Sequence, residues 1–87
     1  MAFATQGPTL KHFILRQRVL NLYRQAVRAS RSIPDIQTRS ETVRWIRGEF
    51  ERNRHISDVT LIEDKLAAGR RELRQILPTI ALPIAQA

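Results

Sequence analysis

Apolar residues recur at helical spacing in three separate stretches of the chain. In the first stretch, four of them follow one another at spacings of four, three and four residues: Leu15, Val19, Leu22 and Ala26. Because an α-helix completes one turn about every 3.6 residues, this spacing places them on one face. Thr9 can cap the start of such a helix, and Pro34 disfavours its continuation. The pattern therefore predicts a helix over about residues 9–32.

The second stretch is shorter and carries Val43, Ile46 and Phe50 on one face. Thr38 and Glu41 before this stripe have the spacing of a capping box, in which both side chains accept hydrogen bonds from backbone N–H groups. These signals predict a second helix over about residues 39–53.

The third stretch has the most regular pattern, with spacings of four, three, four and three between Ile62, Leu66, Gly69, Leu73 and Ile76. Ser57 can cap its start and Pro78 ends it, so a helix is predicted over about residues 58–77. Gly69 lies within the apolar stripe itself. Its missing side chain leaves room for a ligand, or allows close packing against Trp45 or Phe50, and the sequence favours neither.

Three amphipathic segments joined by short connections predict one all-α domain over residues 1–87, an antiparallel three-helix bundle. A short non-helical lead precedes the first helix, and an uncharged apolar tail, residues 79–87, follows the third. The chain has 87 residues and no cysteine, so neither disulfides nor a thiolate metal site can stabilise it. We expect its stability to come from helix packing or from a partner.

Charge adds a prediction about the partner. Fifteen basic residues against eight acids give a net charge of +7, which favours nucleic acid, an anionic membrane surface or an acidic protein. No acid precedes Asp35, and a basic, acid-free amphipathic start is typical of mitochondrial import signals. The same composition also fits arginines that simply solvate one helix face. The apolar runs are too short to cross a bilayer, so we expect no transmembrane helix.

No group of residues predicts catalysis. His12 and His55 are too few and too far apart in the sequence to indicate a metal site. No serine or cysteine nucleophile stands near a base at a recognisable spacing, and no glycine-rich phosphate loop is present. The sequence therefore predicts a binding protein that is not an enzyme and has no metal or cofactor of its own.

Three features together resemble the LYR-motif family of small mitochondrial proteins: Leu22-Tyr23-Arg24, an Arg-x-x-Phe run from Arg47 to Phe50, and a third helix after it. The resemblance covers roughly residues 10–77. It implies an adaptor that binds the acylated form of mitochondrial acyl carrier protein and supports the assembly or stability of respiratory complex I. It also implies a place in the mitochondrial matrix or on the matrix face of the inner membrane. The acyl-phosphopantetheine group then comes from the partner.

The resemblance also implies the site residues. Arginines suit an acidic carrier because they grip phosphate or carboxylate with two parallel hydrogen bonds. The residues expected to contact the partner are Tyr23, Arg24, Arg28, Arg44 and Arg47. The acyl chain is expected to lie among the apolar stripes, where each buried methylene contributes roughly 0.8 kcal/mol. The residues of this acyl-chain pocket are Leu15, Val19, Leu22, Val43, Ile46, Phe50, Ile62, Leu66, Gly69 and Leu73.

Two other functions stay open at this point. One is a basic helical subunit of another mitochondrial assembly, such as the mitochondrial ribosome, in contact with RNA. Against it, the arginines are spread over all three helices and no recognition motif is present, so neither DNA nor RNA is the expected partner. The other is a structural subunit of a large membrane complex, in which the bundle and the tail fill an interface.

Overall fold

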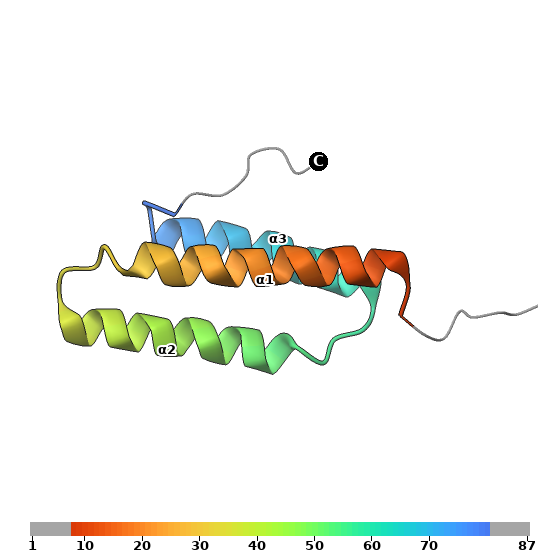
Figure 1. The fold of residues 1–87 in the computed structure, drawn as a ribbon, viewed down its shortest axis with the longest axis horizontal. Helices are drawn as coiled ribbons and strands as arrows, with labels where there is room; N and C mark the ends of the chain where they lie inside the picture. The colour runs from red at the N-terminus through yellow and green to blue at the C-terminus, as the bar shows by residue number, and fades with distance from the viewer. Residues whose placement is uncertain (1–7, 81–87) are drawn as a thin grey trace, which may run out of the picture.

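The computed structural model describes residues 8–80 as three α-helices joined by short connections (Figure 1). The helices are α1 (Leu10–Ser30), α2 (Ile36–Asn53) and α3 (Val59–Ile76). Successive helices run in opposite directions, which confirms the predicted three-helix fold, and no strand occurs in the described part of the chain. Residues 1–7 of the predicted lead and 81–87 of the predicted tail lie outside the described residues.

The start of α1 follows the sequence prediction. The Thr9 hydroxyl accepts a hydrogen bond from the backbone N–H of His12 at 3.3 Å, and the Thr9 backbone N–H donates to Nδ1 of His12 at 3.1 Å. The two residues thus form a capping box with histidine in the usual place of an acid. α1 ends at Ser30 and not at residue 32, because Arg31 is already the C-cap and turn hydrogen bonds follow it.

The predicted start of α2 is wrong by three residues. Asp35, not Thr38, is the N-cap, and its carboxylate accepts from the backbone N–H of Thr38 at 2.8 Å. The Thr38 hydroxyl donates to the same carboxylate at 2.7 Å, so Thr38 lies in the first turn of the helix. Asp35 and Thr38 both have side chains that can cap a helix. Asp35 is the cap because its backbone, directly after Pro34, is extended, as an N-cap requires.

The predicted start of α3 is wrong by one residue. The structure also shows a contact near this point that the sequence did not predict. Asp58 caps the helix by accepting from the backbone N–H of Leu61 at 3.1 Å, so the predicted cap Ser57 lies one residue too early. The Ser57 carbonyl instead lies 2.7 Å from Nε2 of His12. A proton on Nε2 makes this contact a hydrogen bond to the Ser57 carbonyl and leaves Nδ1 to accept from Thr9, so His12 fastens the start of α1 to the connection before α3.

The core lies where α1 packs against the other two helices. α1 contacts α2 on one side and α3 on another, whereas no Cα atom of α2 comes within 8 Å of one in α3. α1 is therefore the central element, and a gap separates the other two. The buried cluster consists of Leu22, Ala26, Ile46, Leu73, Leu77 and Ile80.

The chain after α3 turns back onto the bundle. Leu77 and Ile80 are both buried, and the backbone N–H of Ile80 donates to the Leu77 carbonyl at 3.0 Å across Pro78. The hydroxyl of Thr79 lies 3.2 Å from that of Ser32, just beyond the end of α1. The first residues of the apolar tail therefore close the core at this end.

Replacing Asp35 with alanine should lower the melting temperature in a pH-dependent way. Hydrogen bonds from the hydroxyl and then the backbone N–H of Thr38, with the charge of Arg39, hold the pKa of the Asp35 carboxyl below its ordinary value of 3.8. A carboxyl whose pKa is lowered by folding stabilises the fold above its unfolded pKa, and the effect is lost as pH falls through the folded pKa. Thermal unfolding should therefore separate Asp35→Ala from the parent near neutral pH and much less in strong acid.

Asp35→Asn is the matched control, because asparagine also caps helices but does not titrate. It should remain closer to the parent than Asp35→Ala does near neutral pH. Equal melting temperatures for Asp35→Ala and the parent there would show that another residue starts α2.

Candidate functional site

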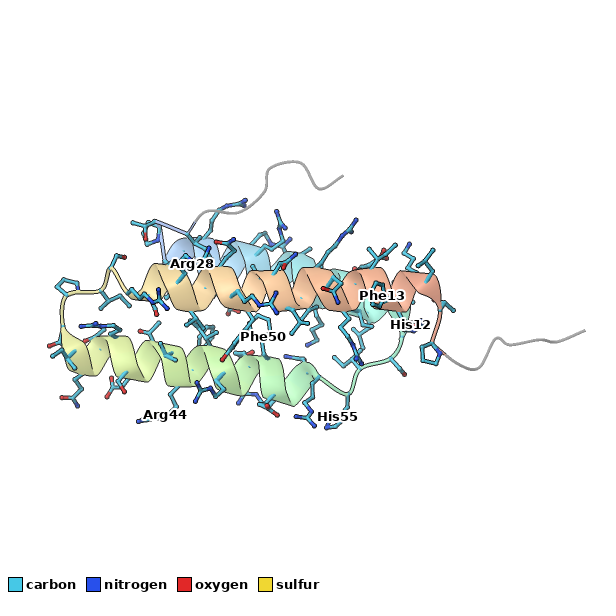
Figure 2. All side chains as sticks on the ribbon, viewed as in Figure 1. His12, Phe13, Arg28, Arg44, Phe50 and His55 are labelled. Atoms are coloured by element: carbon cyan, nitrogen blue, oxygen red, sulfur yellow. The ribbon has the colours of Figure 1, made fainter. Side chains whose placement is uncertain are left out.

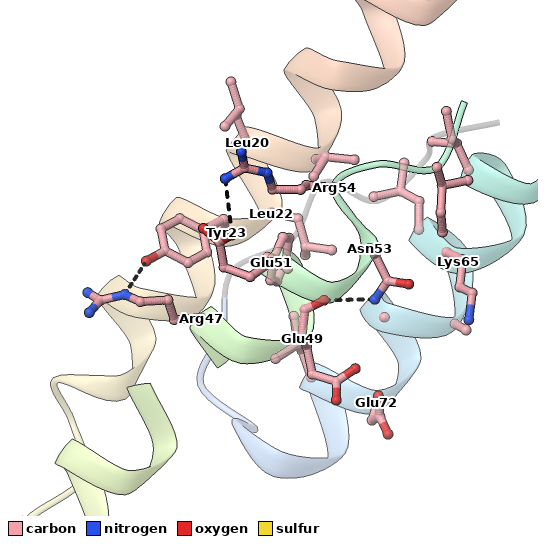
Figure 3. Close-up of a pocket in the computed structure, with 18 of the residues that line it drawn as sticks. Leu20, Leu22, Tyr23, Arg47, Glu49, Glu51, Asn53, Arg54, Lys65 and Glu72 are labelled. Carbon is pink, nitrogen blue, oxygen red and sulfur yellow. Dashed lines mark hydrogen bonds and ion pairs between the residues drawn. The ribbon is translucent and has the colours of Figure 1, made fainter. Parts of the chain in front are cut away.

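The gap between α2 and α3 holds a pocket of about 550 Å³, with α1 as its floor (Figure 3). This volume is usual for small-molecule sites. The inner wall is mainly apolar and the rim carries charged groups. The lining residues are Val19, Leu20, Leu22 and Tyr23 of α1; Trp45, Arg47, Glu49, Phe50, Glu51 and Asn53 of α2; Arg54 and Ile56 of the connection; and Ile62, Lys65, Leu66, Ala68, Gly69, Glu72 and Leu73 of α3.

The structure brings most of the predicted acyl-chain residues to this pocket. Those that line it are Val19, Leu22, Phe50, Ile62, Leu66, Gly69 and Leu73. The other three predicted residues do not line it. Leu15 and Ile46 are 1% and 0% exposed and belong to the packed interior, and Val43 is half-buried on α2. Seven of the ten predicted residues thus line the pocket, and three lie away from it. Contact of any of these residues with an acyl chain stays a prediction.

Gly69 lies between the pocket and α1. A Cβ atom at this position would have Cδ2 of Leu22 as its nearest neighbour, 3.7 Å away, which is ordinary van der Waals contact. The glycine therefore faces Leu22, and neither Trp45 nor Phe50 is the neighbour that a side chain would meet first. A methyl group fits here, whereas a longer side chain has to extend into the pocket.

Tyr23 connects the apolar wall to the charged rim (Figure 3). Its ring meets that of Phe50 edge to face, with centroids 5.2 Å apart and an angle of 70° between the planes. Arg47 donates from Nε to the Tyr23 hydroxyl at 3.4 Å, and this hydrogen bond raises the pKa of the guanidinium. Arg47 is therefore a permanent cation at the pocket edge, beside an aromatic pair that belongs to the apolar wall.

The sequence prediction missed the polar side of the pocket. It includes Glu49 and Asn53 of α2, four residues apart, and Lys65 and Glu72 of α3 (Figure 3). Asn53 donates from Nδ2 to the Glu49 carbonyl at 2.7 Å. These residues lie beside the predicted apolar stripes. They line the pocket because α2 and α3 stay apart, and a reading of single helices cannot detect that separation.

The predicted partner-binding residues do not form one cluster. Tyr23 and Arg47 meet at the pocket rim, as described above, whereas Arg24, Arg28 and Arg44 are exposed and do not line the pocket. In the view of Figure 2, Arg28 lies on the upper side of α1 and Arg44 below α2. A partner that contacts all of them has to cover a broad surface. Glu49 and Arg52, three residues apart on α2, form an ion pair.

The described residues contain no group of three His, Cys, Asp or Glu side chains arranged to hold a metal ion. None of the three helices is long and apolar enough to cross a membrane.

Comparison with known proteins gives a consistent result. The profile of the family described as Complex 1 protein (LYR family) matches residues 17–75, which include the Leu-Tyr-Arg tripeptide and Phe50. LYR motif-containing protein 2 of Xenopus laevis is 43% identical over 68 residues, covering 78% of each chain. The mouse and human proteins of the same name are 38% and 35% identical over 74 residues, covering 85% of this chain and 84% of their own. No solved structure gives a significant match.

Substitutions of Gly69 should separate the stability of α3 from the capacity of the pocket. Gly69→Ala should raise the melting temperature, because glycine within a helix costs up to about 1 kcal/mol relative to alanine and the added methyl meets no clash. Gly69→Leu should reduce the binding of an apolar fluorescent probe by filling the space, while Gly69→Ala should largely preserve it. Thermal unfolding and probe titration measure the two effects. Undiminished probe binding by Gly69→Leu would place the probe outside this pocket.

Proposed function

The chain belongs to the LYR family, and on that premise we propose that it is an adaptor that binds the acylated form of acyl carrier protein in mitochondria. The proposed role is to support the assembly or stability of respiratory complex I, in the matrix or on the matrix face of the inner membrane. The family description refers to complex 1, which supports this assignment. The observation that carries the proposal is the pocket between α2 and α3, apolar inside and charged at its rim.

The pocket suits a fatty chain better than a polar ligand. Its wall includes Leu22, Phe50 and Leu66, of which the last two are only half-buried and gain burial when the pocket is filled. Burying apolar surface is favourable by roughly 25 cal/mol per Å², and each methylene of a chain adds to that gain. In this proposal, the acyl chain lies over α1 and completes the core that the separation of α2 and α3 leaves open.

The side of the rim formed by Tyr23 and Arg47 suits the acidic carrier and its phosphate-bearing arm. Tyr23 and Arg47 lie beside the apolar wall, and exposed Arg24 adjoins Tyr23 on the outer side of α1. We assign these three to the first contact with the carrier. Arg28 and Arg44 are exposed and do not line the pocket, and in this proposal they contact the carrier body and not the arm. The protein itself contributes no cofactor and performs no catalysis.

The acyl group should account for much of the stabilisation by the carrier. A ligand that binds only the folded state raises its stability in proportion to the logarithm of its concentration relative to the dissociation constant. Carrier with a fatty acyl chain should therefore raise the melting temperature of this protein well above the value with carrier that has bare phosphopantetheine. Gly69→Leu should lose most of that difference and keep the contribution of the carrier body. Equal stabilisation by both carriers would mean that the chain stays outside the bundle.

Charge reversal at the rim should weaken carrier binding. Arg47→Glu and Arg24→Glu each put a negative charge where the acidic partner approaches, and we expect each to reduce the affinity at least about tenfold. Arg18→Glu is the matched control, because it makes the same change on exposed α1 surface that does not line the pocket. Binding of the parent should also weaken as salt rises, since exposed charges are screened. If Arg18→Glu lost as much affinity as Arg47→Glu, a non-specific effect of net charge would explain the interaction, as expected for a basic RNA-contacting subunit.

A further inference from the structure

Two large apolar side chains on the outer face of α1 belong to neither the core nor the pocket. Leu10 and Phe13 are 73% and 59% exposed, although both are large and apolar. Phe13 and buried Leu15 are two residues apart, which places them about 200° apart around the helix. Figure 2 shows Phe13 over the near side of α1, with α3 behind the helix. Leu20 continues the strip one turn beyond Gln17 and is 39% exposed, although it also lines the pocket.

The charge on this helix is of one sign. From Leu10 to Ser30, α1 contains basic residues and no acid. Arg16 lies between Phe13 and Leu20 along the helix and flanks the apolar strip. Lys11 pairs with Glu63 of α3 at 3.1 Å, whereas no hydrogen bond or ion pair engages Arg16 within the described residues. The strip, formed by Leu10, Phe13 and Leu20, thus has a cation beside it that is available to an outside partner other than the carrier.

We propose that this strip docks on the surface of a lipid bilayer rich in anionic phospholipids, with α1 lying parallel to the membrane. Arginines can bury their stems along apolar surface and keep the guanidinium at the phosphate level. Helices with this combination settle at the boundary between headgroups and acyl chains, about 5–10 Å deep. The proposal does not depend on carrier binding. It leaves α2 and α3, with the pocket between them, on the side away from the membrane.

Charge complementarity selects this partner over a second copy of the chain. Two α1 faces brought together would place arginines against arginines with no acid on either helix, which is repulsive. An anionic bilayer instead supplies a phosphate for each guanidinium. Because α1 packs against α2 and α3 with its inner side, its outer side is left for a fluid headgroup layer to contact.

Vesicle flotation of the full-length protein tests this placement. Vesicles of phosphatidylcholine with phosphatidylglycerol should carry the protein upward, and vesicles of phosphatidylcholine alone should not. Binding should decline as salt is raised, since it depends on surface charge. The double change Leu10→Ser with Phe13→Ser should weaken binding at least about tenfold, because it removes two apolar anchors. Ile36→Ser is the matched control, since Ile36 is 74% exposed at the start of α2 and should not matter.

The orientation can be measured with tryptophan fluorescence. Trp45 is the only tryptophan and lies on α2, so its emission should stay unchanged when anionic vesicles are added. A Phe13→Trp variant should instead gain a component that shifts to shorter wavelength and is quenched by brominated lipids. Quenching of Trp45 alone would reverse the proposed orientation.

The other outcomes also decide. Circular dichroism checks that each variant is folded. Arg16→Glu offers a second test, because it leaves the apolar strip intact and should still weaken binding to anionic vesicles.

The proposal would be overturned if the parent did not float with anionic vesicles. It would also be overturned if the parent, the double variant Leu10→Ser with Phe13→Ser, and Arg16→Glu all floated equally. Concentration-dependent dimers of the parent that disappear in the double variant would assign the strip to a second copy of the chain. Loss of acyl carrier protein binding in the double variant and in Arg16→Glu would assign the strip to the carrier.

Discussion

The separation of α2 from α3 determines the rest of the structure. α1 packs against both helices, and they do not approach each other within 8 Å between Cα atoms. Helices packed in direct contact have axes about 8–10 Å apart, so the side chains of a fully closed bundle would fill this space. Here Phe50 and Leu66 are only half-buried, and the space between them is a pocket. The incomplete core of a small chain is at the same time the feature best suited to hold a ligand.

An open pocket has to be supported by contacts elsewhere. His12 contributes one of them, because its ring joins the cap of α1 to the Ser57 carbonyl before α3 and so fixes that end of the bundle. At the opposite end, Leu77 and Ile80 fold back into the core. Contacts thus hold both ends of the bundle together, whereas the space between α2 and α3 stays open. A chain this short has a small margin of stability, so filling the middle should affect the whole fold.

The local features of the fold could be predicted from the sequence, and the distances between helices could not. Periodicity located all three helices, and Thr9 marked the start of α1, because these signals act within a few residues. The start of α2 was misplaced because Asp35 and Thr38 both have capping side chains. The polar rim, with Glu49 and Glu72, depends on how far α2 lies from α3, and no pattern along a single helix contains that information.

The arrangement around α1 gives a physical account of the Leu-Tyr-Arg tripeptide. Successive residues of a helix are rotated by about 100°, so three in a row point in three directions. Leu22 is 4% exposed in the core, Tyr23 lies at the pocket rim against Phe50 and Arg47, and Arg24 faces solvent. One helical turn therefore presents an apolar, an aromatic and a cationic group to core, pocket and surface in that order. This requires a helix with a packed side, an open side and an exposed side, as the central position of α1 provides.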